Sequence, residues 1–137
     1  GVVFQSDEKT RLSPLFDNGT ALGHERFLDK VQDWDDNKLK AYLKKGCHHL
    51  RISRADTRTR IQHFALVKAL AGSDETIKTY VQKKIERLDV EGMLAEIERL
   101  TEIKIDVPFT RERFAWIKRN IIARLELVKE EIRNEND

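Results

Sequence analysis

Apolar residues recur every three or four positions through most of the chain after residue 24, which predicts helices with one buried face. The longest such segment starts at Thr110 and runs for about 23 residues, a rod of roughly 34 Å. Its stripe consists of Phe114, Ile117, Ile121, Leu125, Val128 and Ile132. Because Trp116, Ile122 and Leu127 fall beside that stripe, we predict a helix wedged into a bundle rather than a two-stranded coiled coil.

Shorter helices are predicted upstream, with ends set by capping residues and glycines. We expect them over residues 24–32, from Asp35 or Asp36 to Lys45, over 58–71 with Gly72 ending it, over 73–87 with Ser73 as its cap, and from Asp89 to about Leu100. In the helix over 73–87, the residues expected to face inward are Ile77, Tyr80, Val81 and Ile85. Gly92 should weaken the helix that Asp89 begins. The short joins imply antiparallel neighbours in a small bundle.

The N-terminal residues have a strand-like pattern instead. Val2 to Gln5 and Thr10 to Ser13 flank a polar turn and predict a short β-hairpin, which is too small to be stable alone. The predicted fold class is therefore mainly α, a small helical bundle with an N-terminal β-hairpin. We expect one domain over residues 1–137, with the hairpin and a loop in 1–23 and the bundle in 24–137.

Composition narrows the class of protein. Charged residues make up 36% of the chain, and 26 Lys and Arg against 24 Asp and Glu leave a net charge of +2, so no charge excess favours nucleic acid. The single cysteine, Cys47, excludes an internal disulfide and suits a reducing compartment. No apolar run approaches the roughly 18 residues of a membrane span, and no signal peptide is evident. We therefore expect a cytoplasmic protein without a membrane partner.

The loop after the predicted hairpin carries the first candidate chemistry. Pro14 keeps Ser13 extended, and Asn18 and Gly19 tolerate positive φ, so the chain can turn sharply just after Asp17. That geometry holds one carboxylate at the mouth of a core, where a hard cation with oxygen ligands can bind. The alternative from spacing alone is a plain tight turn, which is the commoner use of such a sequence.

The same loop resembles a known segment. Residues 12–23 read Leu-Ser-Pro-Leu-Phe-Asp-Asn-Gly-Thr-Ala-Leu-Gly and are similar to the metal-binding segment of HipA-type serine/threonine protein kinases, L-x-P-x-[FY]-D-x-[GA]-[ST]-S-L-G. Gly-Cys-His-His-Leu-Arg at 46–51 is similar to a G-x-H-H-x-R stretch in one branch of that family, and Val107-Pro108 before the last helix fits its C-terminal end. Ala21 departs from the family, which commonly has serine there.

The resemblance implies a set of roles. Asp17 would hold the Mg²⁺ of ATP, as the Asp of D-F-G does in ordinary kinases, although Asn18 replaces the phenylalanine. Asn18, Thr20 and His49 would support that site from outside the metal's ligand shell. The family's catalytic loop, D-x-H-x-x-N-W, would lie upstream of Gly1. The chain is then expected to be the C-terminal lobe of a kinase, inactive alone, whose parent acts on a protein substrate and pairs with a DNA-binding antitoxin repressor.

Two further stretches leave alternatives open. Cys47, His48 and His49 look like metal ligands, but adjacent side chains diverge, so hydrogen bonding of a histidine near the Asp17 loop is preferred to a zinc site. Residues 51–60 carry four arginines against one aspartate, which suits a phosphorylated or acidic segment or else a solvated surface. The alternative function is a non-enzymatic helical module that binds a protein or nucleic acid through residues 51–60, with direct nucleic-acid binding the less expected outcome.

Overall fold

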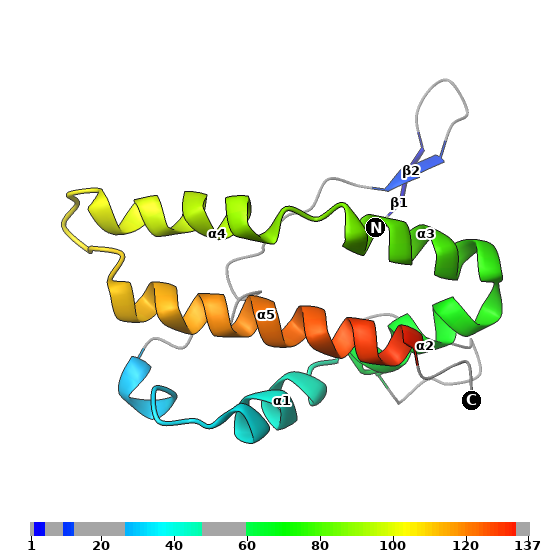
Figure 1. Cartoon of the computed structure of the whole chain (residues 1–137), viewed down its shortest axis with the longest axis horizontal. Helices are drawn as coiled ribbons and strands as arrows, with labels where there is room; N and C mark the ends of the chain where they lie inside the picture. The colour runs from blue at the N-terminus through cyan, green and yellow to red at the C-terminus, as the bar shows by residue number, and fades with distance from the viewer. Residues whose placement is uncertain (1, 5–9, 13–26, 48–59, 134–137) are drawn as a thin grey trace.

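The computed structural model of the chain describes residues 2–4, 10–12, 27–47 and 60–133, and it is mainly helical (Figure 1). Two short strands, β1 (Val2–Phe4) and β2 (Thr10–Leu12), pair antiparallel with Val3 opposite Arg11. The helical elements are η1 (Leu28–Lys30), α1 (Asp36–Lys44), α2 (His63–Ser73), α3 (Glu75–Glu86), α4 (Val90–Arg99), η2 (Leu100–Glu102) and α5 (Arg111–Arg133). The prediction of a mainly helical bundle is confirmed.

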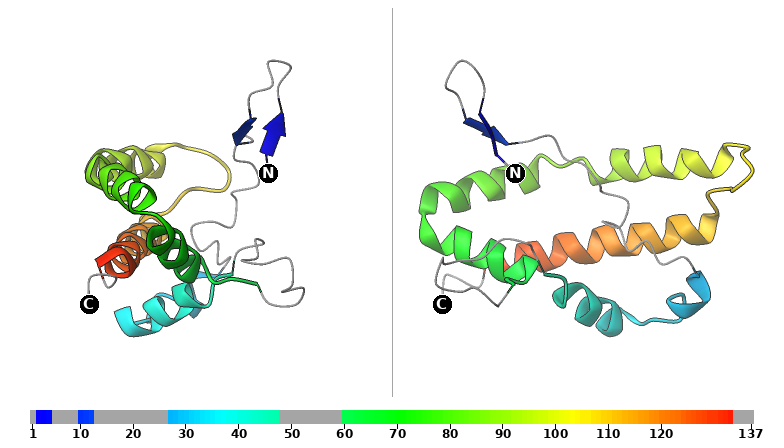
Figure 2. Two further views of the ribbon diagram at one scale, coloured as in Figure 1. Left: turned by 90° about the vertical axis from the view of Figure 1, so that its right-hand side faces the viewer. Right: turned by 180° about the vertical axis from the view of Figure 1, so that it is seen from behind.

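The long helix α5 is the axis of the bundle. Helices α3 and α4 follow one another along one side of it, and α1 lies on the opposite side (Figure 1). The left view of Figure 2 looks along the bundle and places α5 between α4 and α1. Packing follows the same plan, because α1, α2 and α4 all contact α5 whereas α3 packs against α2.

The main core lies between α1, the start of α2 and α5. Its buried members are Val31, Leu39, Leu43, Phe64, Trp116, Ala123 and Leu127. The most buried row of α5 is thus Trp116, Asn120, Ala123 and Leu127, and not the stripe through Ile117, Ile121 and Leu125, which are half-buried. Of the predicted stripe, Phe114 and Ile132 are buried, and the other four residues are half-buried. Two sides of the helix are apolar, and periodicity alone does not say which side meets the densest neighbours.

Trp34 and α5 are joined by aromatic and polar contacts. The ring of Trp34 lies edge-on to Tyr42 and to Trp116, with centroids 5.3 and 5.9 Å apart. Arg119 of α5 donates from Nη2 to the Trp34 carbonyl at 2.7 Å and to the Asp36 carboxylate at 3.0 Å. These contacts hold α1 against α5 and leave the C-terminal end of α1 pointing at the start of α2.

Several predicted helix ends are confirmed. The Asp35 carboxylate accepts the N–H of Lys38 at 2.7 Å and caps α1, and Asp89 caps α4 through the N–H of Gly92 at 2.8 Å. Thr110 accepts the N–H of Arg113 at 3.2 Å at the start of α5. Each cap satisfies a donor that the first helical turn leaves without an intrahelical partner.

Other ends differ from the predictions. Helix α2 begins at His63, not at 58, and Gly72 and Ser73 belong to its last turn, so Asp74 and not Ser73 caps α3. The Asp74 carboxylate accepts the N–H of Thr76 at 2.6 Å, whereas the Ser73 hydroxyl donates back to the Leu70 carbonyl. A charged acceptor binds an orphan N–H more strongly than a hydroxyl does, so aspartate takes the cap. The helix expected over 24–32 is the short 3₁₀ turn η1 within the described residues.

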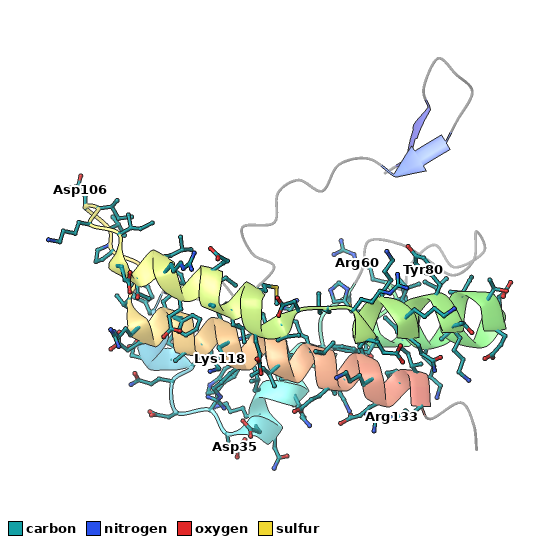
Figure 3. The ribbon with its side chains drawn as sticks, turned by 45° about the horizontal axis from the view of Figure 1, so that its top comes forward. Asp35, Arg60, Tyr80, Asp106, Lys118 and Arg133 are labelled. Atoms are coloured by element: carbon teal, nitrogen blue, oxygen red, sulfur yellow. The ribbon has the colours of Figure 1, made fainter. Side chains whose placement is uncertain are left out.

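Helix α3 departs from its predicted face at Ile77 and Tyr80, whereas Val81 and Ile85 are half-buried. Tyr80 is 60% exposed and Ile77 is 37% exposed, while the buried residue of this helix is Lys78. Figure 3 shows Tyr80 on the outer side of α3. Lys78 lies against the α2–α3 junction, where its ammonium is 3.9 Å from the Glu75 carboxylate. Its long stem covers apolar surface that a shorter residue would leave open.

Candidate functional site

The residues that the sequence assigned to a magnesium site lie outside the described part of the chain. Asp17, Asn18 and Thr20 fall within 13–26, and His49 falls within 48–59. The structure therefore neither brings them together nor separates them, and the predicted Mg²⁺ and ATP sites stay predictions. Of the arginine-rich stretch, Arg60 alone is described, and it is exposed.

The structure does describe the base from which residues 48–59 leave the bundle. The N–H of His63 donates to the Gly46 carbonyl at 3.0 Å, and Cys47 and Gln62 form an antiparallel bridge beside it. Cys47 is exposed, and its thiol lies 3.4 Å from the Lys45 carbonyl. The chain thus departs and returns at one point, between the end of α1 and the start of α2.

Gly46 is required at this point by close approach. A Cβ placed on Gly46 would lie 2.8 Å from Cδ2 of His63 and 3.2 Å from the Leu43 carbonyl oxygen. Non-bonded carbon atoms approach to about 3.5 Å at best, so a side chain here would push the imidazole away. The sequence signal for this glycine was its place after a helix, and the structure adds the packing of His63 as a second reason.

A cavity of about 590 Å³ adjoins this base. It lies between α1, α2 and α5, and its lining residues are Tyr42, Leu43, Lys45, Gly46, His63, Phe64, Val67, Arg124 and Val128. Most of the lining is apolar, and the basic side chains of Arg124 and Lys45 supply positive charge. Its size is in the range of small-molecule pockets, about 300 to 1,000 Å³.

Arg124 is the unusual member of this lining. Its Nε atom is buried and has no hydrogen-bond partner among the described residues. Burial lowers the pKa of the guanidinium, and the nearby Tyr42 acts in the opposite direction. Sequence reasoning missed this residue. A signal was available, because Arg124 follows Ile121, Ile122 and Ala123 in a helix that is apolar on more than one side, where a cation has to meet an apolar neighbour.

The described residues contain neither a metal-binding cluster nor a membrane-spanning helix. Within residues 27–47 and 60–133, no group of three or more His, Cys, Asp or Glu side chains is arranged to hold a metal ion. No helix in the described part of the chain has the length and apolar character that crossing a membrane requires.

No protein-family model, no curated protein and no solved structure matches the chain. What the protein does must therefore be inferred from its own residues, their motifs and their surroundings.

Proposed function

We propose that the chain is the C-terminal lobe of a HipA-like, ATP-dependent serine/threonine protein kinase in which Asp17 holds the magnesium of ATP. The observation that carries the proposal is the block at 12–23, where an apolar, proline-containing run delivers one carboxylate into an Asn-Gly turn. A mainly helical bundle with a long last helix is compatible with the lobe that the resemblance predicts.

The second similar block, residues 46–51, gives further support. Its first residue, Gly46, is held between α1 and α2 by the hydrogen bond from His63 and by the close contact with its imidazole. A fixed starting point limits where the following residues can reach, so the bundle would help to position His49. In this proposal His49, Asn18 and Thr20 orient the loop around Asp17, and the bundle provides the rigid support for that loop.

The chemistry assigned to Asp17 is electrostatic. In phosphoryl transfer the metal bridges phosphate oxygens and neutralises developing charge, and the protein positions the reactants. One carboxylate without the phosphates is a poor magnesium site, because Mg²⁺ gives up its water reluctantly. This chain alone should therefore lack kinase activity and bind Mg-ATP more weakly than micromolar in isothermal titration. The parent enzyme would act in the cytoplasm on a protein substrate and would pair with a DNA-binding antitoxin repressor.

The test uses the parent kinase with Asp17→Asn, which keeps size and hydrogen bonding but removes the charge that binds the metal. Autophosphorylation with Mg-ATP should fall to background while circular dichroism and the melting temperature stay unchanged. Asp33→Asn is the matched control, because Asp33 is an exposed carboxylate outside the motif and should leave activity intact. Near-wild-type autophosphorylation by Asp17→Asn would reduce Asp17 to a turn residue and overturn the proposal.

Binding measurements separate the kinase from a nucleic-acid-binding module. If residues 51–60 contact nucleic acid, affinity for mixed-sequence duplex DNA should fall steeply with salt, because each neutralised phosphate releases counterions. The net charge of +2 and the lack of a recognisable helix-turn-helix pattern favour little binding at physiological salt. Tight, salt-dependent binding that is lost when Arg54, Arg58 and Arg60 are changed together to alanine would favour the module instead.

A further inference from the structure

The cavity between α1, α2 and α5 combines an apolar wall with the half-buried side chain of Arg124. The wall consists of Leu43 and Phe64 of the main core, Val128, which packs against that core, and Val67. Arg124 enters from α5, close to Tyr42 of α1. The volume of about 590 Å³ is sufficient for a small molecule.

The state of Arg124 indicates what kind of group the cavity would accept. A buried polar atom without a partner costs free energy, and a charged one costs more, so native proteins usually satisfy such atoms. Within the part of the chain that the structure describes, the Nε atom of Arg124 has no such partner. By contrast, Arg119, five residues earlier on α5, donates to the Trp34 carbonyl and to the Asp36 carboxylate. An arginine fork is shaped to receive two oxygen atoms of one anion.

We propose that this cavity binds a small amphipathic carboxylate, with its apolar tail against Phe64, Val67 and Val128 and its carboxylate on the guanidinium of Arg124. Lys45, exposed at the rim, adds positive charge on the side from which an anion would approach. A carboxylate rather than a nucleotide is the expected class, because the wall is apolar and Arg124 is the one cation of the described lining that is half-buried. The site is independent of the magnesium site proposed for Asp17.

The experiment compares decanoate with decanol on the intact chain by isothermal titration and by amide chemical-shift mapping. The two probes share a tail length and differ in charge. Decanoate should bind saturably, at least about tenfold more tightly than decanol, because a hydrogen bond to a charged group contributes roughly 1.5 to 3 kcal/mol. The largest shifts should fall on residues of the lining, such as Gly46, Phe64 and Val128.

Separate variants test where the carboxylate of decanoate binds and where its alkyl tail binds. Arg124→Leu keeps an apolar stem but removes the cation, so it should bind decanoate and decanol equally. Arg133→Leu is the matched control: Arg133 is exposed at the end of the same helix (Figure 3), and the change should leave the preference for decanoate unchanged. Val67→Phe fills part of the apolar wall and should weaken both probes. If Arg124→Leu does not fold, two measurements still test the proposal. They are the loss of binding in Val67→Phe and the ratio of the affinities of the wild-type chain for decanoate and decanol.

Three outcomes would overturn the proposal. The first is equal binding of decanoate and decanol by the wild-type chain, and the second is a preference for decanoate that survives Arg124→Leu. The third is no saturable binding by the wild-type chain.

Discussion

Two parts of the bundle use similar amphipathic sequences very differently. Between α1 and α5 the apolar side chains are buried almost completely: Leu39 is 1% exposed and Leu127 is 0% exposed. In the arm formed by α3 and α4, Leu94 is the buried apolar side chain, and Tyr80 is 60% exposed. Burial in a helix is therefore decided by how many neighbours the helix has, and not by the strength of its stripe.

The polar contacts follow the same division. Lys40 of α1 lies 3.3 Å from Glu126 and 3.6 Å from Glu130 of α5, and these carboxylates raise the pKa of its ammonium. In the arm, the described ion pairs join neighbours on one helix: Lys78 with Glu75, and Arg99 with Glu96. Pairs within a helix stabilise that helix but do not hold it against another. We infer that the α1–α5 core carries the stability and that the α3–α4 arm opens more easily.

Truncation of a core leucine should give the largest effect. Leu127→Ala should lower the free energy of unfolding by about 2 to 5 kcal/mol, because it removes buried contacts and leaves a cavity. Ile77→Ala in the arm is the matched control and should cost less than about 1 kcal/mol, since Ile77 is 37% exposed and lies at the surface. Urea denaturation followed by circular dichroism measures both. Equal losses would remove the distinction between core and arm.

Asn120 is a polar residue in the α1–α5 core, and its replacement by an apolar residue should stabilise the protein. It is 0% exposed, and its Nδ2 donates to the Trp116 carbonyl at 2.9 Å. Its Oδ1 is buried and accepts no hydrogen bond from the described residues. Asn120→Leu should raise the free energy of unfolding by about 1 to 2 kcal/mol, because an unsatisfied buried acceptor costs roughly 1 to 3 kcal/mol. Thermal denaturation gives the sign directly. A lower melting temperature would mean that the amide has a role that a leucine cannot replace.

Substitution of Gly46 tests how closely the chain packs at the edge of the core, where α1 meets α2. Gly46→Ala should lower the free energy of unfolding by about 1 kcal/mol, since the new methyl group would push the His63 imidazole aside. Gly46→Ala combined with His63→Ala should recover part of that loss, because the obstructing ring is then absent. Urea denaturation of the single and double variants measures both changes in the free energy of unfolding. If the second substitution restores nothing, the close contact with His63 is not what requires the glycine.

The smallest expected effect on stability comes from Asp74, the N-terminal cap of α3 in the arm. The pKa of Asp74 is lowered from 3.8 because its carboxylate accepts the Thr76 N–H, so the cap is fully effective above 3.8 and is lost as the pH falls below that value. The protection factor of the Thr76 amide, which is its intrinsic exchange rate divided by its observed rate, should therefore fall as the pH is lowered from about 4 to about 2. Asp74→Asn keeps an acceptor without the charge and should abolish this pH dependence. An unchanged profile in that variant would exclude the carboxylate as its cause.

Local rules predicted most of the helices. Capping chemistry placed the starts at Asp35, Asp89 and Thr110, because a cap depends on residues within one turn. Gly92 shows where such rules stop. It was expected to weaken α4, but a Cβ there would run into the Asp89 carboxylate, so the glycine leaves room for the cap. Helix propensity alone does not include that neighbour.

Burial could not be predicted in the same way. The sequence placed Tyr80 inside and gave no reason to bury Lys78, because the face of α3 is chosen by its packing on α2, a tertiary contact. The cavity also depends on three helices meeting, so the apolar residues before Arg124 mark it as a cation near apolar surface but do not place it in a cavity. The residues around Asp17 differ from Arg124 in both respects. Their sequence pattern is distinctive, but they lie outside the described residues.

Native-state hydrogen exchange followed by NMR tests most directly the claim that the α1–α5 core carries the fold and the α3–α4 arm opens first. Amides of α5 from Asn120 to Leu127 should exchange only through global unfolding, with free energies equal to that from urea denaturation. Amides in the middle of α3, around Val81, should exchange through a cheaper local opening. Equal protection of the two helices, or stronger protection of α3, would contradict the account.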